Sequence, residues 1–87
     1  MNFGQLLNNK NMNKYLWAEC PVDVWPVIKT LVARSYNDAV EKLIIKYGEE
    51  FDDDTILNTI ENWDQLREYL NEQFDIALSD LEEIDEL

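Results

Sequence analysis

Residues 27–48 read VIKTLVARSYNDAVEKLIIKYG, and this stretch decides the fold. Its first seven residues are mostly β-branched or apolar and alternate in character, which predicts a β-strand. Ser35 followed by Asp38 is typical of a helix N-terminus, because the Ser hydroxyl can accept a hydrogen bond from the backbone N–H three residues on. Apolar residues then recur at helical spacing up to Gly48, where we expect the helix to end. The stretch therefore predicts a strand that leads directly into a helix.

A second strand-like run precedes this unit. Residues 14–20 read KYLWAEC and are followed by the Pro-bounded segment PVDVWP, so the two runs predict a β-hairpin. Side chains alternate across a strand, which assigns them to two faces. In the earlier strand we expect the core face to carry Leu16, Ala18 and Cys20, and the opposite face to carry Tyr15, Trp17 and Glu19. In the later strand one face carries Ile28, Thr30 and Val32, and the other carries Val27, Lys29, Leu31 and Ala33.

The remaining segments are predicted from the same signals. Residues 1–13 are rich in Asn and form a lead-in segment. Residues 55–61 favour a short third strand because Thr55, Ile56, Thr59 and Ile60 are β-branched, with a helical turn capped by Asp54 as the alternative. A long final helix is predicted to start at Asn62 or Asp64. Ser79 with Glu82 is a second helix-start signal, which would restart the helix after a break. Whether residues 79–87 are ordered therefore stays open. The apolar stripe of the final helix consists of Trp63, Leu66, Leu70, Phe74, Ala77, Leu81 and Ile84.

These elements predict one domain over residues 1–87, with the hairpin and first helix in residues 14–48 and an acidic half in residues 49–87. The expected fold class is α+β: a small antiparallel sheet, made of the hairpin and a short third strand, packed by two helices in the order β-β-α-β-α. A chain of 87 residues that is 46% hydrophobic can close one small core. No run approaches the roughly 18 apolar residues of a membrane span, so we expect a cytoplasmic protein without membrane contact.

The charge is unevenly distributed along the chain. Seven basic and nineteen acidic residues give a formal net charge of −12. Residues 1–48 hold six basic and four acidic side chains, whereas residues 49–87 hold fifteen acidic side chains and only Arg67 as a base. Phosphate would be repelled by such a chain, so a direct nucleic-acid ligand is disfavoured. A basic protein is the expected partner.

The residue types that most catalysis requires are absent or isolated. The chain has no His, two Gly and one Cys, so neither a Cys–His pair nor a Gly-rich phosphate loop can be drawn. Cys20 is expected to be a buried small hydrophobe. The acidic run at residues 52–54 does not match a calcium-binding EF-hand loop. Such a loop would require an oxygen ligand at the position of Ile56 and a glycine at the position of Leu57. We therefore expect no enzyme, no metal and no cofactor.

The acidic residues of the expected final helix gather on one side. At about 100° per residue they fall opposite the apolar stripe. From Asp64 to Glu86 there are nine acids and Arg67, a net −8 over about 33 Å, or about one charge every 4 Å against about 3.4 Å in one DNA strand. A plain solvated face is the alternative, but it would leave like charges at i,i+4 unrelieved. The expected partner-binding residues are Asp52, Asp53, Asp54, Asp64, Glu68, Tyr69, Glu72, Asp75, Glu82, Glu83 and Glu86.

Short length, a pI near 4, an α+β scaffold and a one-sided carboxylate array together resemble the acidic DNA-mimic inhibitors of phages and mobile elements, of the anti-CRISPR or anti-restriction class. The resemblance implies a stoichiometric inhibitor that blocks the basic nucleic-acid site of a host defence nuclease. Two alternatives stay open. One is an immunity-type protein that neutralises a toxic nuclease. The other is a phage regulatory or assembly module that binds its partner through the aromatic hairpin surface around Trp17 and Trp25.

Overall fold

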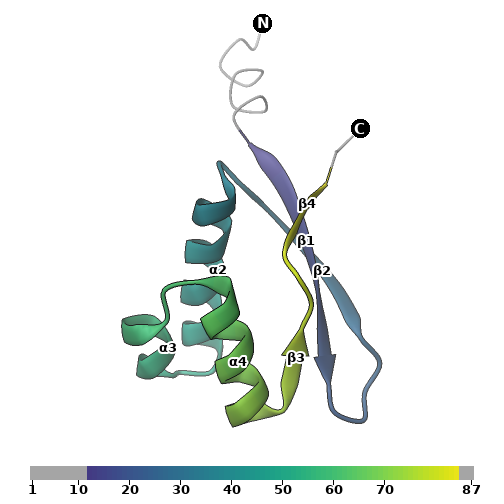
Figure 1. Ribbon diagram of the computed structural model, residues 1–87, viewed down its shortest axis with the longest axis vertical. Helices are drawn as coiled ribbons and strands as arrows, with labels where there is room; N and C mark the ends of the chain where they lie inside the picture. The colour runs from purple at the N-terminus through teal and green to yellow at the C-terminus, as the bar shows by residue number, and fades with distance from the viewer. Residues whose placement is uncertain (1–11, 85–87) are drawn as a thin grey trace, which may run out of the picture.

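The structure, a computed structural model, describes residues 12–84. Within this range, helices lie on one face of a four-stranded antiparallel sheet, so the expected α+β class is confirmed (Figure 1). β1 is central, with β2 on one side and both β3 and β4 on the other. No helix within the described range is long and apolar enough to cross a membrane. The elements are β1 (Asn13–Pro21), β2 (Val27–Ala33), α2 (Tyr36–Glu50), α3 (Asp54–Thr59), α4 (Trp63–Phe74), β3 (Ile76–Leu78) and β4 (Glu82–Ile84).

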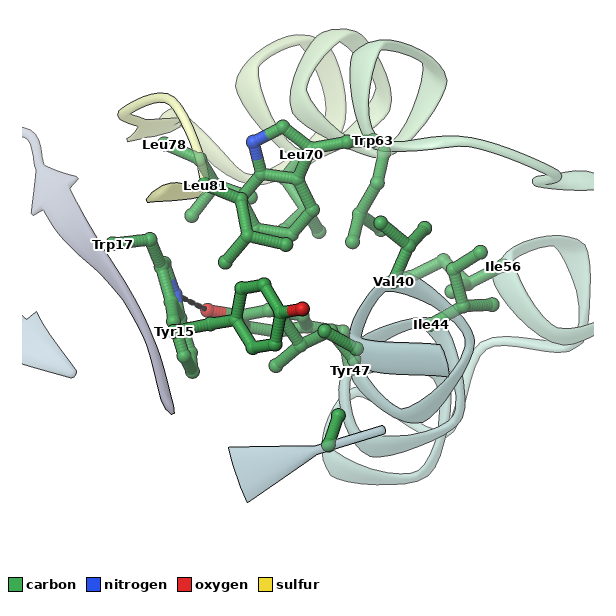
Figure 2. Packing of buried hydrophobic residues seen from close by; sticks show 14 residues of the cluster. Tyr15, Trp17, Val40, Ile44, Tyr47, Ile56, Trp63, Leu70, Leu78 and Leu81 are labelled. Carbon is green, nitrogen blue, oxygen red and sulfur yellow. Dashed lines mark hydrogen bonds between the residues drawn. The ribbon is translucent and has the colours of Figure 1, made fainter. Parts of the chain in front are cut away.

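The predicted hairpin is confirmed, but the predicted core face of β1 is wrong. β1 and β2 pair in register from Asn13 opposite Ala33 to Glu19 opposite Val27. Tyr15 and Trp17 point into the core and are each 1% exposed. These large aromatic side chains bury more apolar area than the smaller side chains of the opposite face. In addition, the Trp17 indole N–H donates a hydrogen bond to the buried Tyr47 hydroxyl at 2.9 Å (Figure 2). The side chains that we expected in the core lie half-buried on the open face of the sheet; they are Leu16, Ala18 and Cys20.

Helix α2 begins as predicted and ends later than predicted. The Ser35 hydroxyl accepts a hydrogen bond from the Asp38 N–H at 3.1 Å, which confirms the N-cap. Gly48 does not stop the helix, which continues to Glu50. Gly48 is buried where α2 meets α3, and a Cβ atom there would collide with the side chain of Leu57. The residue therefore permits close helix packing instead of a left-handed turn.

Residues 54–59 form helix α3, so the preferred third strand at residues 55–61 is wrong. Asp53, one residue before the Asp54 that we considered, caps this helix by accepting a hydrogen bond from the Thr55 N–H at 2.9 Å. The Thr59 hydroxyl bonds to the Thr55 carbonyl at 2.6 Å, which accommodates a β-branched residue within the helix. Ile56 is fully buried and anchors the helix in the core.

Helix α4 starts at the predicted place and stops ten residues before Ile84. The Asn62 side chain accepts a hydrogen bond from the Gln65 N–H at 2.8 Å and caps its beginning. At its end Asp75 adopts the left-handed conformation with φ 57, and its N–H bonds to the Leu70 carbonyl. The predicted helix beyond Phe74 is therefore wrong, because this turn sends the chain back along β1 as strands β3 and β4.

β3 and β4 together act as one interrupted strand beside β1. Leu78 pairs with Glu19 and Glu82 pairs with Leu16, so three residues, 79–81, lie opposite two in β1. This is a β-bulge, and it exchanges the faces of the following residues. Ser79 secures it, since its N–H donates to the Ala18 carbonyl at 3.0 Å and its hydroxyl accepts from the Ala18 N–H at 2.7 Å.

The core lies between the sheet and the helices and draws on nearly every element (Figure 2). The predicted packing of α4 through Trp63, Leu66 and Leu70 is confirmed, whereas Phe74 is only half-buried and stacks on Phe51 at 4.4 Å. Of the apolar positions predicted beyond it, Leu81 is buried in the core, Ile84 is half-buried and Ala77 is exposed. The buried apolar residues are Tyr15, Trp17, Ala33, Ala39, Val40, Leu43, Ile44, Tyr47, Ile56, Trp63, Leu66, Leu70, Leu78 and Leu81.

Candidate functional site

A row of carboxylates follows the outer side of α4, and we call it the α4 acidic row. It consists of Asp64, Glu68, Glu72 and the capping residue Asp75, all exposed. The opposite side of the helix is buried against the core, so the amphipathic division that the sequence predicts is present over the length of the helix. Since the positions are four, four and three residues apart, the four side chains lie on neighbouring turns.

The α4 acidic row is about half as long as the array expected from the sequence. Asp64 and Asp75 are eleven residues apart, which is about 16 Å at a rise of about 1.5 Å per residue. Four carboxylates over that length give about one every 5 Å. The row is therefore less dense than the phosphates of one DNA strand, which are about 3.4 Å apart along the axis. Its length corresponds to about half of one turn of a DNA helix, which is about 34 Å.

Three of the four carboxylates have no partner within the described part of the chain. No hydrogen bond or ion pair from residues 12–84 involves the side chains of Glu68, Glu72 or Asp75. Asp64 lies 3.7 Å from Arg67. Arg67 is directed mainly to the C-terminal strand, where its Nε donates to the Leu78 carbonyl at 3.0 Å. The row thus presents uncompensated negative charge to solvent.

The loop between α2 and α3 lies beside α4. The Tyr69 hydroxyl donates to the Asp53 carboxylate at 2.7 Å, and this bond, with the capping bonds from Thr55 and Ile56, lowers the pKa of Asp53 below its usual range. Asp53 and the half-buried Tyr69 therefore hold the loop to the helix, and their polar atoms are already engaged. The other two predicted residues of the loop, Asp52 and Asp54, are exposed.

The C-terminal acids do not belong to the α4 acidic row. Glu82 and Glu83 lie on β4, where they pair with Leu16 and Tyr15 of β1. The prediction that they share a helix face with Glu68 is wrong, because the chain leaves the helix at Asp75. Glu86 lies outside the described residues.

The tip of the hairpin is apolar and exposed, and the sequence only partly predicts it. Trp25 is 87% exposed, and Val22 and Val24 beside it are also largely exposed. The Val22 N–H bonds to the Asp75 carbonyl at 3.3 Å, so the tip adjoins the end of the α4 acidic row. Trp17, the other aromatic residue named for a hairpin surface, is buried and cannot contact a partner. The sequence signal for this exposed tip is the cluster of apolar residues within the Pro-bounded turn PVDVWP.

Two hollows of the described surface lie near the helices. The larger one, of about 550 Å³, lies between α2 and the segment from α3 to α4, with apolar walls that include Val40, Ile44 and Leu57 and with Glu41 and Glu61 among its polar residues. A smaller depression of about 290 Å³ borders Asp64, Arg67 and Glu68. Within residues 12–84 no group of three or more potential ligands could hold a metal ion. The arrangement is suited to binding cationic side chains.

Comparison with known protein families, with curated proteins and with solved structures found no match to this chain.

Proposed function

We propose that the chain is a non-catalytic, stoichiometric inhibitor that occupies the basic nucleic-acid site of a host defence nuclease. The observation that carries the proposal is the α4 acidic row, in which Glu68, Glu72 and Asp75 have no cationic partner within residues 12–84. On an ordinary solvated helix, lysines between the acids would relieve the repulsion of like charges at i,i+4. Here Asp64, Glu68 and Glu72 follow one another at that spacing, and of the three only Asp64 has a basic neighbour within residues 12–84, Arg67 at 3.7 Å.

The electrostatics of the chain support this kind of partner. A net charge of −12 attracts a basic groove over long range and speeds encounter, and the fixed row on α4 supplies orientation on contact. A partner whose groove binds phosphates would release DNA when it binds this surface. Affinity should fall steeply with salt, because exposed charges separated by more than about 8 Å are screened near 0.15 M.

The direct test removes charge and preserves shape. Glu68→Gln, Glu72→Gln and Asp75→Asn are combined in one variant, and Asn tolerates the left-handed backbone at residue 75. A control variant with the same charge change combines Glu41→Gln, Glu49→Gln and Glu61→Gln, all at exposed positions outside the row. Wild type, test variant and control are immobilised, loaded with bacterial lysate, and eluted with duplex DNA.

The proposal requires that wild type and control capture a protein that duplex DNA elutes, and that the test variant loses it. If all three capture equal amounts at about 0.15 M salt, the row is only a solvated surface. With the captured enzyme purified, inhibition should be complete at a molar ratio of about one and should reverse when the chain is removed, as binding requires. Lasting inhibition by substoichiometric amounts would indicate catalysis instead. A captured toxin nuclease would identify the immunity-type alternative.

A second candidate function is favoured by the exposed hairpin tip. Trp side chains that are largely exposed in a free protein and border polar residues are typical anchors of protein interfaces. In a regulatory or assembly module, Trp25 with Val22 and Val24 would form the main contact. Trp25→Ser would then abolish capture, the charge variant would not, and binding would depend little on salt.

A further inference from the structure

The two edges of the sheet differ in how well they are protected from pairing. One edge consists of β3 and β4, which have three residues each, are separated by the bulge at residues 79–81 and carry Glu82 and Glu83. Short strands, bulges and charged side chains keep sheet edges from pairing with other chains. The other edge is β2, with seven uninterrupted residues. Its one charged side chain, Lys29, lies on the helix side of the sheet and pairs with Glu19 at 3.5 Å.

The hydrogen bonds of Ala18 establish which backbone groups of β2 face the free edge. Both the N–H and the C=O of Ala18 bond to Ser79, on the side of β1 away from β2. Ala18 and its partner Ile28 are therefore a pair without mutual hydrogen bonds. Because backbone groups alternate in direction along a strand, those of Ile28, Thr30 and Val32 point to the free edge. Among residues 12–84 no strand lies there to receive them.

One contact at this edge agrees with the assignment. The Val32 carbonyl accepts a hydrogen bond from Lys42 Nζ of α2 at 3.3 Å, so that carbonyl is not bonded to β1 and points to the free edge. A carbonyl oxygen has two lone pairs, and the ammonium leaves one of them for a further N–H. Lys42 also pairs with Asp38 at 3.6 Å. The contact therefore does not close the edge.

The outward residues are arranged symmetrically about Thr30. Ile28 and Val32 are 61% and 51% exposed, and their side chains share the open face of the sheet. If a second β2 pairs antiparallel with Thr30 opposite its own copy, then Ile28 of each chain lies opposite Val32 of the other. All three pairs then exchange two backbone hydrogen bonds each. Pairs of β-branched residues and Thr–Thr pairs stabilise neighbouring strands.

We infer that β2 pairs with β2 of a second copy of this chain, about a two-fold axis at Thr30, to form one continuous sheet. The charge distribution favours this occupant. Residues 24–37 contain two basic and no acidic side chains, in a chain with nineteen acids. The α4 acidic row lies on the other side, because α4 packs by β3, across β1 from β2. Two copies thus meet where their mutual repulsion is least. The inference rests on β2 and is independent of the proposed inhibition.

Cysteine cross-linking tests the register. In a Cys20→Ser background, Thr30→Cys places two thiols opposite each other with Cα atoms about 5.5 Å apart, within the range of a disulfide. Ile28→Cys is the matched control, because its two copies would be separated by four residues along the strands, about 13 Å. Under mild oxidation Thr30→Cys should form a covalent dimer and Ile28→Cys should not, while Ile28→Cys mixed with Val32→Cys should form the mixed dimer. Equal cross-linking of Thr30→Cys and Ile28→Cys alone would overturn the inference.

Sedimentation equilibrium of the full chain tests the association without any cysteine. The wild type should show a monomer–dimer equilibrium between micromolar and millimolar concentration. Thr30→Pro removes an N–H that points away from β1, so it should keep the circular dichroism of the fold and be monomeric. Thr30→Lys, which opposes two ammonium groups at the axis, should dissociate the dimer as well and serves if the Pro variant does not fold. A wild type that is monomeric throughout, or a dimer that persists in Thr30→Lys, would refute the pairing of β2.

Discussion

The hydroxyl of Tyr47 in α2 donates a hydrogen bond to the Glu19 carboxylate in β1 and accepts one from Trp17 Nε1 at 2.9 Å. Glu19 also pairs with Lys29 of β2 at 3.5 Å. One helix hydroxyl is thereby linked to both strands of the hairpin through side chains. In the described part of the chain no buried side-chain nitrogen or oxygen lacks a hydrogen-bond partner.

Tyr47→Phe should lower the free energy of unfolding by about 1 to 3 kcal/mol, because the buried Trp17 N–H loses its acceptor. Urea denaturation measures the change. Tyr36→Phe is the matched control: Tyr36 is half-exposed and its hydroxyl makes no hydrogen bond within residues 12–84, so its removal should cost less than about 0.5 kcal/mol. Equal effects of the two substitutions would contradict the role of the Tyr47 hydroxyl.

Stability should also fall at alkaline pH through Tyr47. Burial, followed by the hydrogen bond to Glu19, raises the pKa of Tyr47 well above its usual value of 10.0. A pKa that is higher in the folded than in the unfolded chain means that the folded state favours the neutral hydroxyl. The contribution of Tyr47 to the free energy of unfolding is therefore complete below about pH 10 and is lost as the pH rises beyond the pKa of this group in the unfolded chain. Urea unfolding at increasing pH should therefore show a steeper loss for wild type than for Tyr47→Phe. Parallel curves above pH 10 would refute this linkage.

Leu70→Ala should lower the free energy of unfolding by about 2 to 5 kcal/mol, because the fully buried side chain leaves a cavity between α4 and the sheet. Ile45→Ala provides a control for a half-exposed aliphatic residue on α2 and should cost much less. Thermal or urea unfolding measures both. A change below about 0.5 kcal/mol for Leu70→Ala would contradict the position of α4 in the core.

Gly48→Ala should have opposite effects in two backgrounds. In a helix interior Ala is favoured over Gly by about 1 kcal/mol, but here the new methyl group would collide with Leu57. We expect the single variant to be less stable than wild type. In a Leu57→Ala background, where the obstructing atoms are absent, the same substitution should increase stability. A double-mutant cycle with no coupling between the two positions would show that α2 and α3 do not pack closely at Gly48.

Helices α2 and α4 could be located from sequence because their signals are local. The N-cap residues Ser35 and Asn62 accept hydrogen bonds from residues three positions on, and the apolar spacing marks the buried side within each helix. The acidic row on α4 follows from the same periodicity. Its extent was overestimated because the apolar spacing continues past Asp75, at Ala77, Leu81 and Ile84, although Ala77 and Ile84 lie in strands and Leu81 lies between those strands.

Local sequence alone determined the hairpin, the beginnings of α2 and α4 and the uneven charge. Tertiary structure decided what depended on distant partners. β1 has apolar side chains on both faces, and Tyr47 in another layer decides that Trp17 turns inward. Residues 76–78 and 82–84 become strands because β1 offers an unpaired side, and backbone groups leaving α4 at Asp75 find hydrogen-bond partners there. Such pairing has no local signature, because it joins residues about 60 positions apart, as Ala18 and Ser79 show.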